Sequence, residues 1–201
     1  MSLENQPSQN HSFSRKTPEG DERERLVCNN CDFVHYENPK IVVGSVCVWN
    51  KADDGEPRFL MCRRAIAPRV GFWTIPAGFM EEKETPEQGA MREAREEACA
   101  TIVPKALLAV YSIPRISQVQ MMYISSLSTA DIAPGPESTD VALLRWSEIP
   151  WDEIAFPSVY WALAHYQQVH NQGVFAPFTN PDGQNGDFDL AAAKSLIQPV
   201  L

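Results

Sequence analysis

Three glutamates on one expected helix are the residues of this chain best suited to bind a cation. Glu93, Glu96 and Glu97 are spaced i, i+3 and i+4, which puts their carboxylates on one face of an α-helix. Carboxylates this close raise one another's pKa unless a cation lies between them. Oxygen ligands of this kind suit Mg²⁺ or Mn²⁺. The alternative interpretation is a solvated acidic face with Arg92 and Arg95 as counter-ions.

The distribution of charge singles out the same segment. The 201 residues include 17 Lys and Arg against 26 Asp and Glu, a formal net charge of −9. Residues 78–97 contain seven of the acids and three of the bases, so this segment carries −4 of the total. A chain without a basic footprint is not expected to bind a polynucleotide. A nucleotide that arrives with its metal remains a suitable partner.

The elements around the acidic helix indicate an α/β domain. Thr85-Pro86-Glu87-Gln88 forms a capping box with proline at the first helical position, so the helix is expected to begin at Pro86. Gly89 within this helix indicates a close helix–sheet contact. Apolar patterns predict strands at 41–49, 58–63, 72–75, 106–113, 119–125 and 141–146, a loop at 132–140, a second helix at 158–170 and a short helix at 189–198.

Composition predicts three regions along the chain. Residues 1–38 form an arm and a small module around Cys28 and Cys31, residues 39–172 form the main domain, and residues 173–201 form a tail. Residues 1–25 are polar, so we expect most of them to be mobile or loosely packed. The sequence has no apolar run of membrane-spanning length and no secretory leader, which predicts a cytoplasmic protein. Cys47 and Cys62 lie in apolar runs and are expected to be core thiols.

With its flanks, the acidic segment resembles the Nudix hydrolase box. The matching pattern is Gly78-x5-Glu84-x7-Arg92-Glu93-Ala94-x-Glu96-Glu97. The resemblance implies a Nudix fold, an α/β/α sandwich with a mixed β-sheet, and Mg²⁺-dependent hydrolysis of a nucleoside diphosphate linked to another group. It also implies that Glu93, Glu96, Glu97 and the Gly78 carbonyl hold the metal, that Arg92 orients the carboxylates, and that Glu84 braces the loop.

Much of residues 39–166 resembles one branch of these enzymes, the ADP-ribose and FAD pyrophosphatases with an N-terminal zinc ribbon. The similar segments are 38–44, 62–68, 71–79 and 134–138. The resemblance implies release of AMP and a phosphorylated partner, and a homodimer. Ser117-Gln118 is followed by Val119-Gln120-Met121 instead of the string that marks NADH pyrophosphatases, which disfavours NAD(H). NAD(H) or an oxidised nucleoside triphosphate is the alternative substrate, and a non-catalytic nucleotide sensor is the alternative of another class.

Several residues outside the metal set are candidates for catalysis and substrate binding. Glu97 and Glu137 are the candidates for the base that takes a proton from water, with Glu93 beside them. Glu137 lies on a Pro-Gly-Pro loop, where an ordinary surface glutamate is the alternative, and Asp140 is a weaker substitute. The expected phosphate or ribose contacts are Arg63, Arg64 and Arg69, and the aromatic residues that could stack on a base are Phe79, Phe72 and Tyr111.

Two positions depart from the pattern of the family. Cys99 stands where the box normally has the glycine that ends the helix in a left-handed conformation, at a cost of about 1 kcal/mol. In the ribbon, Gln6 and Gln9 stand where a first Cys-x-x-Cys is expected, which leaves the pair Cys28 and Cys31. Structural zinc needs four ligands. His11 or His35 would have to complete the set, so we expect a ribbon remnant without zinc.

Overall fold

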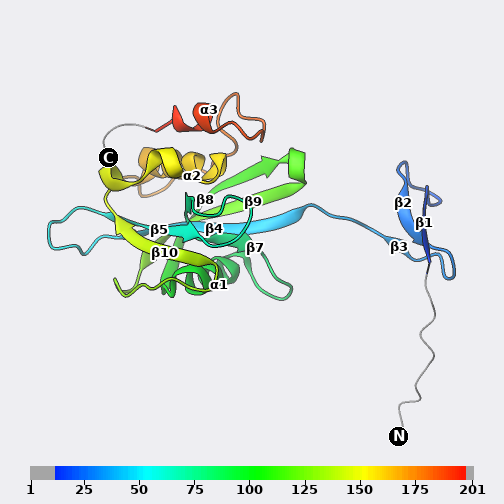
Figure 1. The fold of residues 1–201 in the computed structure, drawn as a ribbon. Helices are drawn as coiled ribbons and strands as arrows, with labels where there is room; N and C mark the ends of the chain where they lie inside the picture. Colours follow the sequence, from blue (N-terminus) through cyan, green and yellow to red (C-terminus); the bar gives the residue numbers. More distant parts are fainter. Residues whose placement is uncertain (1–11, 198–201) are drawn as a thin grey trace, which may run out of the picture. The chain divides into compact units, whose positions relative to one another are not determined.

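The computed structural model describes residues 12–197 of the chain, which divides after Asn38 into two compact units (Figure 1). The smaller unit contains a three-stranded antiparallel sheet in the order β1-β2-β3. Its strands are β1 (Phe13–Lys16), β2 (Arg25–Cys28) and β3 (Val34–His35).

This sheet corrects the expectation of a loosely packed arm for the described part of residues 1–25. Phe13 to Lys16 pair residue by residue with Cys28 to Arg25. Pairing of main-chain groups holds the strand, although its side chains are mostly exposed. Amino-acid composition indicates which segments can bury apolar side chains, so it does not reveal a strand whose side chains are mostly exposed. Residues 1–11 lie outside the described part of the chain.

The larger unit is built on a seven-stranded mixed sheet in the order β10-β5-β4-β9-β8, with β6 paired to β5 and β7 to β4. The β4–β9 pair is parallel and the other pairs are antiparallel. The strands are β4 (Lys40–Trp49), β5 (Arg58–Arg64), β6 (Trp73–Thr74), β7 (Ala77–Phe79), β8 (Ile102–Ile113), β9 (Gln118–Leu127) and β10 (Ser138–Leu144). Strand β10 therefore begins inside the segment predicted as a loop at 132–140.

Helices cover both faces of this sheet. Helix α1 (Pro86–Ala98) lies on one face, and α2 (Pro157–Val169) with α3 (Leu190–Lys194) lies on the other (Figure 1). Short 3₁₀ turns occur at Pro114–Ile116, Trp146–Glu148 and Trp151–Glu153. The predicted α/β/α sandwich with a mixed sheet is confirmed. Within residues 12–197, no helix is long and apolar enough to cross a membrane.

The two faces of the sheet have different cores. On the α1 side, Ala94 and Ala98 pack with Leu60 and the buried thiols Cys47 and Cys62, as expected for core cysteines. Small helix residues let α1 approach the sheet closely. On the α2 side the core is aromatic, and its large rings include Phe59, Tyr111, Trp146, Trp161 and Tyr166.

Local sequence signals determine both ends of α1. Thr85 Oγ1 accepts a hydrogen bond from the Gln88 amide at 3.3 Å, and Gln88 Oε1 accepts one from the Thr85 amide at 2.8 Å, so the predicted capping box is formed. A Cβ atom on Gly89 would lie 2.7 Å from Val43 Cγ2, which confirms the close helix–sheet contact. The helix ends at Cys99 with φ 50°, the left-handed conformation that favours glycine.

The segment from residue 173 packs against the larger unit. The Phe178 amide donates to the Leu108 carbonyl, and the Val110 amide donates to the Phe178 carbonyl, both at 2.9 Å. The Phe178 ring stacks on His165 with a centroid distance of 4.1 Å. Ala193 of α3 is fully buried in the aromatic core. This segment therefore belongs to the packing of the domain.

Candidate active site

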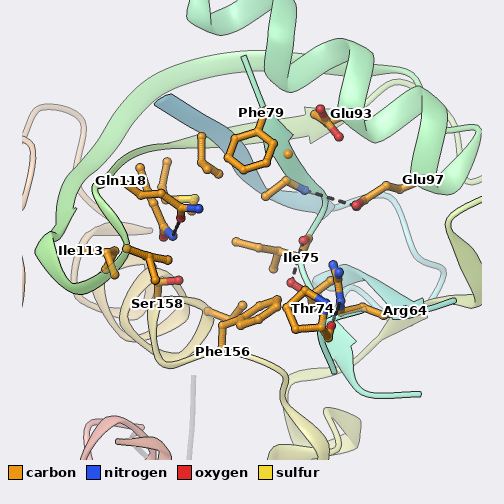
Figure 2. A pocket seen from close by; sticks show the side chains of 18 of the residues that line it. Arg64, Thr74, Ile75, Phe79, Glu93, Glu97, Ile113, Gln118, Phe156 and Ser158 are labelled. Atoms are coloured by element: carbon orange, nitrogen blue, oxygen red, sulfur yellow. Dashed lines mark hydrogen bonds between the residues drawn. The ribbon is translucent and has the colours of Figure 1, made fainter. Parts of the chain in front are cut away.

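A cavity of about 790 Å³ brings together residues from the sheet, both large helices and several loops (Figure 2). The carboxylates of Glu93 and Glu97 lie on one side of it and Gln118 lies on the other. We call the side with Glu93, Glu96, Glu97 and Glu137 the acidic end. We call the side with Ile113, Gln118, Gln120 and Ser158 the amide end. All eight of these residues line the cavity.

Helix α1 supplies the acidic end with two buried carboxylates. Glu93 is 7% exposed and Glu97 is 4% exposed, whereas Glu96 is exposed. A Cβ atom on Gly78 would lie 2.4 Å from the Glu93 carboxylate, so a larger residue in strand β7 would displace this carboxylate from its position. Glu97 Oε2 accepts a hydrogen bond from the Ala77 amide at 3.3 Å.

The acidic end has more negative charge than its surroundings neutralise. Burial, followed by the neighbouring Glu93 charge, raises the pKa of Glu97 to about 8. Burial also raises the pKa of Glu93, although the Arg92 guanidinium acts in the opposite direction. Two buried carboxylates with raised pKa values form a donor set that fits a divalent cation.

Arg92 binds the carboxylates and the loop before the helix. Its guanidinium donates to both oxygens of Glu84, at 3.1 and 2.9 Å, and to the Phe79 carbonyl at 2.9 Å. It also donates to Glu93 at 2.7 Å and to Glu96 at 2.8 Å. These contacts hold the pKa of Glu84 below its usual value, chiefly through the hydrogen bond from Arg92. Arg92, expected to orient the carboxylates, therefore contacts Glu93 and Glu96 directly. Glu84, expected to brace the loop, is held by the same guanidinium.

The carboxylates expected to bind metal lie in the same cavity but do not converge on one point. Within the described residues, no three acidic, histidine or cysteine side chains form a metal-binding group. The reason is the bridge from Arg92 to Glu93 and Glu96. Glu96 is the exposed member, so its carboxylate can exchange Arg92 for a cation at little cost in burial.

The loop before β10 places Glu137 at the acidic end. The Gly135 amide donates to the Glu97 carbonyl at 3.1 Å, and a Cβ atom at this position would lie 1.6 Å from the Glu96 carbonyl oxygen. The Ala65 amide donates to the Glu137 carbonyl at 2.8 Å. The backbone of Glu137 is therefore held between the end of α1 and strand β5. Its side chain is exposed and lines the cavity, whereas Asp140 does not line it.

The three arginines expected to contact substrate separate in the structure. Arg64 lines the cavity, donates to the Pro68 carbonyl at 2.8 Å and lowers the pKa of Glu97 through its charge. Arg63 does not line the cavity, because adjacent residues of strand β5 face opposite sides. A guanidinium nitrogen of Arg63 lies 3.7 Å from a carboxylate oxygen of Glu153. Arg69 also does not line the cavity, since its guanidinium stacks on Phe72 at 3.5 Å.

Of the three aromatic candidates, Phe79 alone lines the cavity. It is 51% exposed, and the Lys40 ammonium lies 5.1 Å from the centre of its ring. Tyr111 is fully buried and its hydroxyl contacts His165 Nδ1 at 2.7 Å, so it belongs to the core. Sequence spacing does not show which face of β8 carries Tyr111.

The sequence interpretation missed the amide end as a site. Gln118 and Gln120 are two residues apart on β9, so they share one face of the strand, and Gln120 Nε2 donates to Gln118 Oε1 at 3.3 Å. In the part of the chain that the structure describes, Gln120 Oε1 and Trp161 Nε1 are buried without a hydrogen-bond partner. Each such atom costs about 1–3 kcal/mol. The alternation of Gln118 and Gln120 in an otherwise apolar strand signals that they share a face, but only the fold shows that this face lines a cavity.

Residues 186–188 also line the cavity and were not predicted to do so. Gly186, Asp187 and Phe188 lie in a Gly- and Asn-rich stretch that carries no motif. These residues reach the cavity because their stretch packs against the end of β8. No local sequence signal could have shown that they line the cavity.

The cysteine pair of the smaller unit lies on a tight turn. The Cys28 amide donates to the Phe33 carbonyl at 2.8 Å, and the Asp32 amide donates to the Cys28 carbonyl at 3.1 Å. Cys28 is buried and Cys31 is exposed. His35 lies opposite Leu26 in the β2–β3 pair. His11 lies outside the described residues.

Comparison with known proteins gives two matches to family models. The NUDIX domain model matches residues 39–165, and the Nudix N-terminal zinc-ribbon model matches residues 10–37. The crystal structure of a NUDIX hydrolase from Nitrosomonas europaea is 42% identical to this chain, covers 86% of it and 97% of that protein, and superposes with a TM-score of 0.75.

Two curated proteins are more distant relatives. An ADP-ribose pyrophosphatase from Methanocaldococcus jannaschii is 24% identical over 119 residues, which are 57% of this chain and 67% of that protein. An NAD-capped RNA hydrolase from Stutzerimonas stutzeri is 26% identical over 124 residues, which are 62% of this chain. The chain spans 42% of the length of this second relative. The matched domain and its cavity together lead to one assignment: the chain belongs to the NUDIX hydrolase family.

Proposed function

We propose that this protein hydrolyses the diphosphate bond of an ADP-linked nucleotide, with ADP-ribose and FAD as the first candidates, to AMP and a phosphorylated partner. The observation that carries the proposal is the meeting of buried Glu93 and Glu97 with exposed Glu137 in one cavity. Its volume of about 790 Å³ suits a dinucleotide. The named activity of the archaeal relative supports the substrate class.

The residues that would hold Mg²⁺ or Mn²⁺ are Glu93, Glu96, Glu97 and the Gly78 carbonyl. The bound ion supplies positive charge that offsets the diphosphate and makes a nearby water more acidic. The chain contributes oxygen donors, and burial raises the pKa values of two of them, Glu93 and Glu97, in the absence of the ion. Arg92 keeps Glu93 and Glu96 close to the site.

We assign the role of general base to Glu137. Its carboxylate is exposed, so it can take a proton from water and release it to solvent, whereas Glu97 is buried and suits metal binding. The water oxygen adds to one phosphorus, the bridging P–O bond breaks, and the proton of the water passes to the carboxylate. Arg64 lines the same cavity and supplies a positive charge for the phosphates.

A substrate panel tests the proposal. Purified protein is incubated with Mg²⁺ and ADP-ribose, FAD, NADH or an oxidised nucleoside triphosphate, and the products are separated by chromatography. We expect AMP from ADP-ribose or FAD at a higher kcat/KM than from NADH. Preferred cleavage of the triphosphate would replace the substrate assignment. Binding of all four compounds without cleavage would favour the non-catalytic sensor.

Three further properties belong to the same proposal: a homodimer, which the family resemblance implies, and a cytoplasmic location and a ribbon without zinc, which the sequence predicts. Light scattering of the purified protein tests the homodimer, and fractionation of the source cells tests the cytoplasmic location. Metal analysis of the purified protein tests the zinc-free ribbon, which one zinc per chain would contradict.

A further inference from the structure

The amide end of the cavity has no part in the cleavage chemistry proposed above. Gln118, Gln120 and Met122 alternate along β9 and all line the cavity. In the β8–β9 register Ile113 lies opposite Gln118, and in the parallel β4–β9 register Val42 lies opposite Gln120. Strand pairing therefore places two carboxamides among apolar side chains, on the far side of the cavity from Glu93 and Glu97 (Figure 2).

Two hydrogen-bonding atoms at the cavity wall are unsatisfied. Gln120 Oε1 is an acceptor and Trp161 Nε1 is a donor, and both are buried without a partner among residues 12–197. The Trp161 side chain is fully buried and its residue lines the cavity. Buried polar atoms in native proteins nearly always have partners. A ligand with a donor and an acceptor of its own would satisfy both.

A segment outside the matched NUDIX domain completes the cavity near the amide end. Asn180 accepts from the Ser112 amide at 2.8 Å and donates to the Ser112 carbonyl at 2.9 Å. Gly186 lies so close to the end of β8 that a Cβ atom there would be 2.9 Å from Pro114 Cδ and from the Ser112 carbonyl oxygen. These contacts hold residues 186–188 at the cavity wall.

The chemistry of the amide end suits an uncharged group. Its polar members are the carboxamides of Gln118 and Gln120 and the hydroxyl of Ser158. Asp187 and Arg115, which have opposite charges, also line the cavity. The acidic end, in contrast, carries carboxylates that suit a metal and its phosphates.

We propose that the amide end, closed by residues 180–188, is a subsite for the uncharged heterocycle of the nucleotide. It binds the N–H donors and the imine or carbonyl acceptors of that ring. This inference rests on the proposed function in that the ring belongs to the molecule cleaved at the acidic end. Adenine and flavin share the required chemistry, and Gln120 is the residue that distinguishes a ring from a sugar.

Calorimetric binding tests the subsite without turnover. The full chain is titrated in Mg²⁺ with AMP, which carries adenine, with FMN, which carries flavin, and with ribose 5-phosphate, which carries neither. We expect AMP or FMN to bind about tenfold or more tightly than ribose 5-phosphate, because the ring satisfies the buried polar atoms. The tighter of the two identifies the ring. Equal binding of all three overturns the proposal.

Two variants and a control make the test specific. Gln120→Met keeps the side-chain volume and removes the acceptor, and Asn180→Ala releases the wall segment without changing a lining side chain. Each is expected to reduce AMP or FMN affinity toward that of ribose 5-phosphate, whose own affinity stays unchanged. Gln172→Met, at an exposed position, is the control and should bind as the unaltered protein does. Equal losses for all three ligands, or no loss, would overturn the subsite.

Turnover is measured in parallel, so the two proposals fail in different ways. Ring-dependent binding without cleavage of any dinucleotide rejects the hydrolase proposal and keeps the subsite. Cleavage with no dependence of affinity on the ring rejects the subsite and keeps the hydrolase.

Discussion

The two ends of the cavity differ in how the chain builds them. The acidic end takes Glu93, Glu96 and Glu97 from little more than one turn of α1, and their spacing alone brings them together. The amide end takes its residues from β8, β9 and α2, and its wall comes from residues 186–188. Local spacing thus encodes the expected chemistry, whereas strand register and a distant segment shape the opposite side. The first can be recognised in a sequence and the second cannot.

Replacing a carboxylate at the acidic end is expected to have the largest effect. Glu97→Gln keeps the side-chain size but removes one negative donor, so kcat should fall by about 10³-fold or more. Affinity for AMP or FMN in EDTA should change little, because the amide end is intact. Steady-state kinetics and calorimetry measure the two quantities. Parallel losses in both would mean that the two ends do not act separately.

Glu137→Gln separates proton transfer from metal binding within the acidic end. We expect kcat to fall by about 10²-fold, as for loss of a general base, while the Mg²⁺ concentration for half-maximal activity stays unchanged. Asp140→Asn, three residues further on in strand β10, is the control, since Asp140 does not line the cavity. An unchanged kcat in Glu137→Gln would return the role of base to Glu97.

The pH dependence of stability, compared between the unaltered protein and Glu97→Gln, reports the charge of one carboxylate at the acidic end. The pKa of Glu97 is raised from 4.5 to about 8, so the folded state binds this proton more tightly than the unfolded state. Buried His165, whose pKa is lowered to about 4, acts in the opposite direction up to about pH 6.5, so metal-free protein should lose stability as the pH rises from about 6.5 through 8. Thermal unfolding in EDTA across this range measures the loss. Glu97→Gln should flatten the slope, and an equal slope in both proteins would contradict the assignment.

Magnesium sharpens the same measurement. At pH 8 we expect Mg²⁺ to raise the melting temperature of the unaltered protein by mass action and to raise that of Glu97→Gln less. Gln120→Met, at the opposite end, is the matched comparison and should respond to Mg²⁺ as the unaltered protein does. A weakened response in Gln120→Met would show that the ends are coupled.

The smallest expected effect concerns the exit of helix α1. Cys99 adopts φ 50°, so Cys99→Gly should stabilise the fold by about 0.5–1 kcal/mol, a rise of about 1–4 °C in melting temperature. Since the substitution leaves the charges of the acidic end in place, kcat should remain the same. Denaturant unfolding and the substrate assay measure the two results. Destabilisation would mean that the thiol makes a compensating contact.

Much of the fold could be predicted from local patterns. The capping box at Thr85 specified the start of α1, a β-branched run marked β4, and an apolar run marked β5 within a residue or two. Strand β1 was not predicted because its side chains are exposed and form no apolar pattern. Strand β7 was not predicted because its three residues belong to the segment before the acidic helix. Main-chain pairing holds both strands, and composition does not report that pairing.

The candidate site divides in the same way. Spacing along α1 grouped the carboxylates of the acidic end, and the close approach of Gly78 to Glu93 followed from the family pattern. Arg63 and Arg69 were grouped with Arg64 by position in the chain, but strand alternation and stacking on Phe72 turn them away from the cavity. Gln120 and Phe188 entered the site through register and packing, which no short stretch of sequence displays.

Release of AMP from ADP-ribose and FAD, measured with Mg²⁺ and again with EDTA, tests the central claim most directly. The account predicts AMP and a phosphorylated partner in Mg²⁺, no product in EDTA, and a loss of about 10³-fold in Glu97→Gln. Retention of both substrates uncleaved in Mg²⁺, or equal cleavage in EDTA, would contradict it.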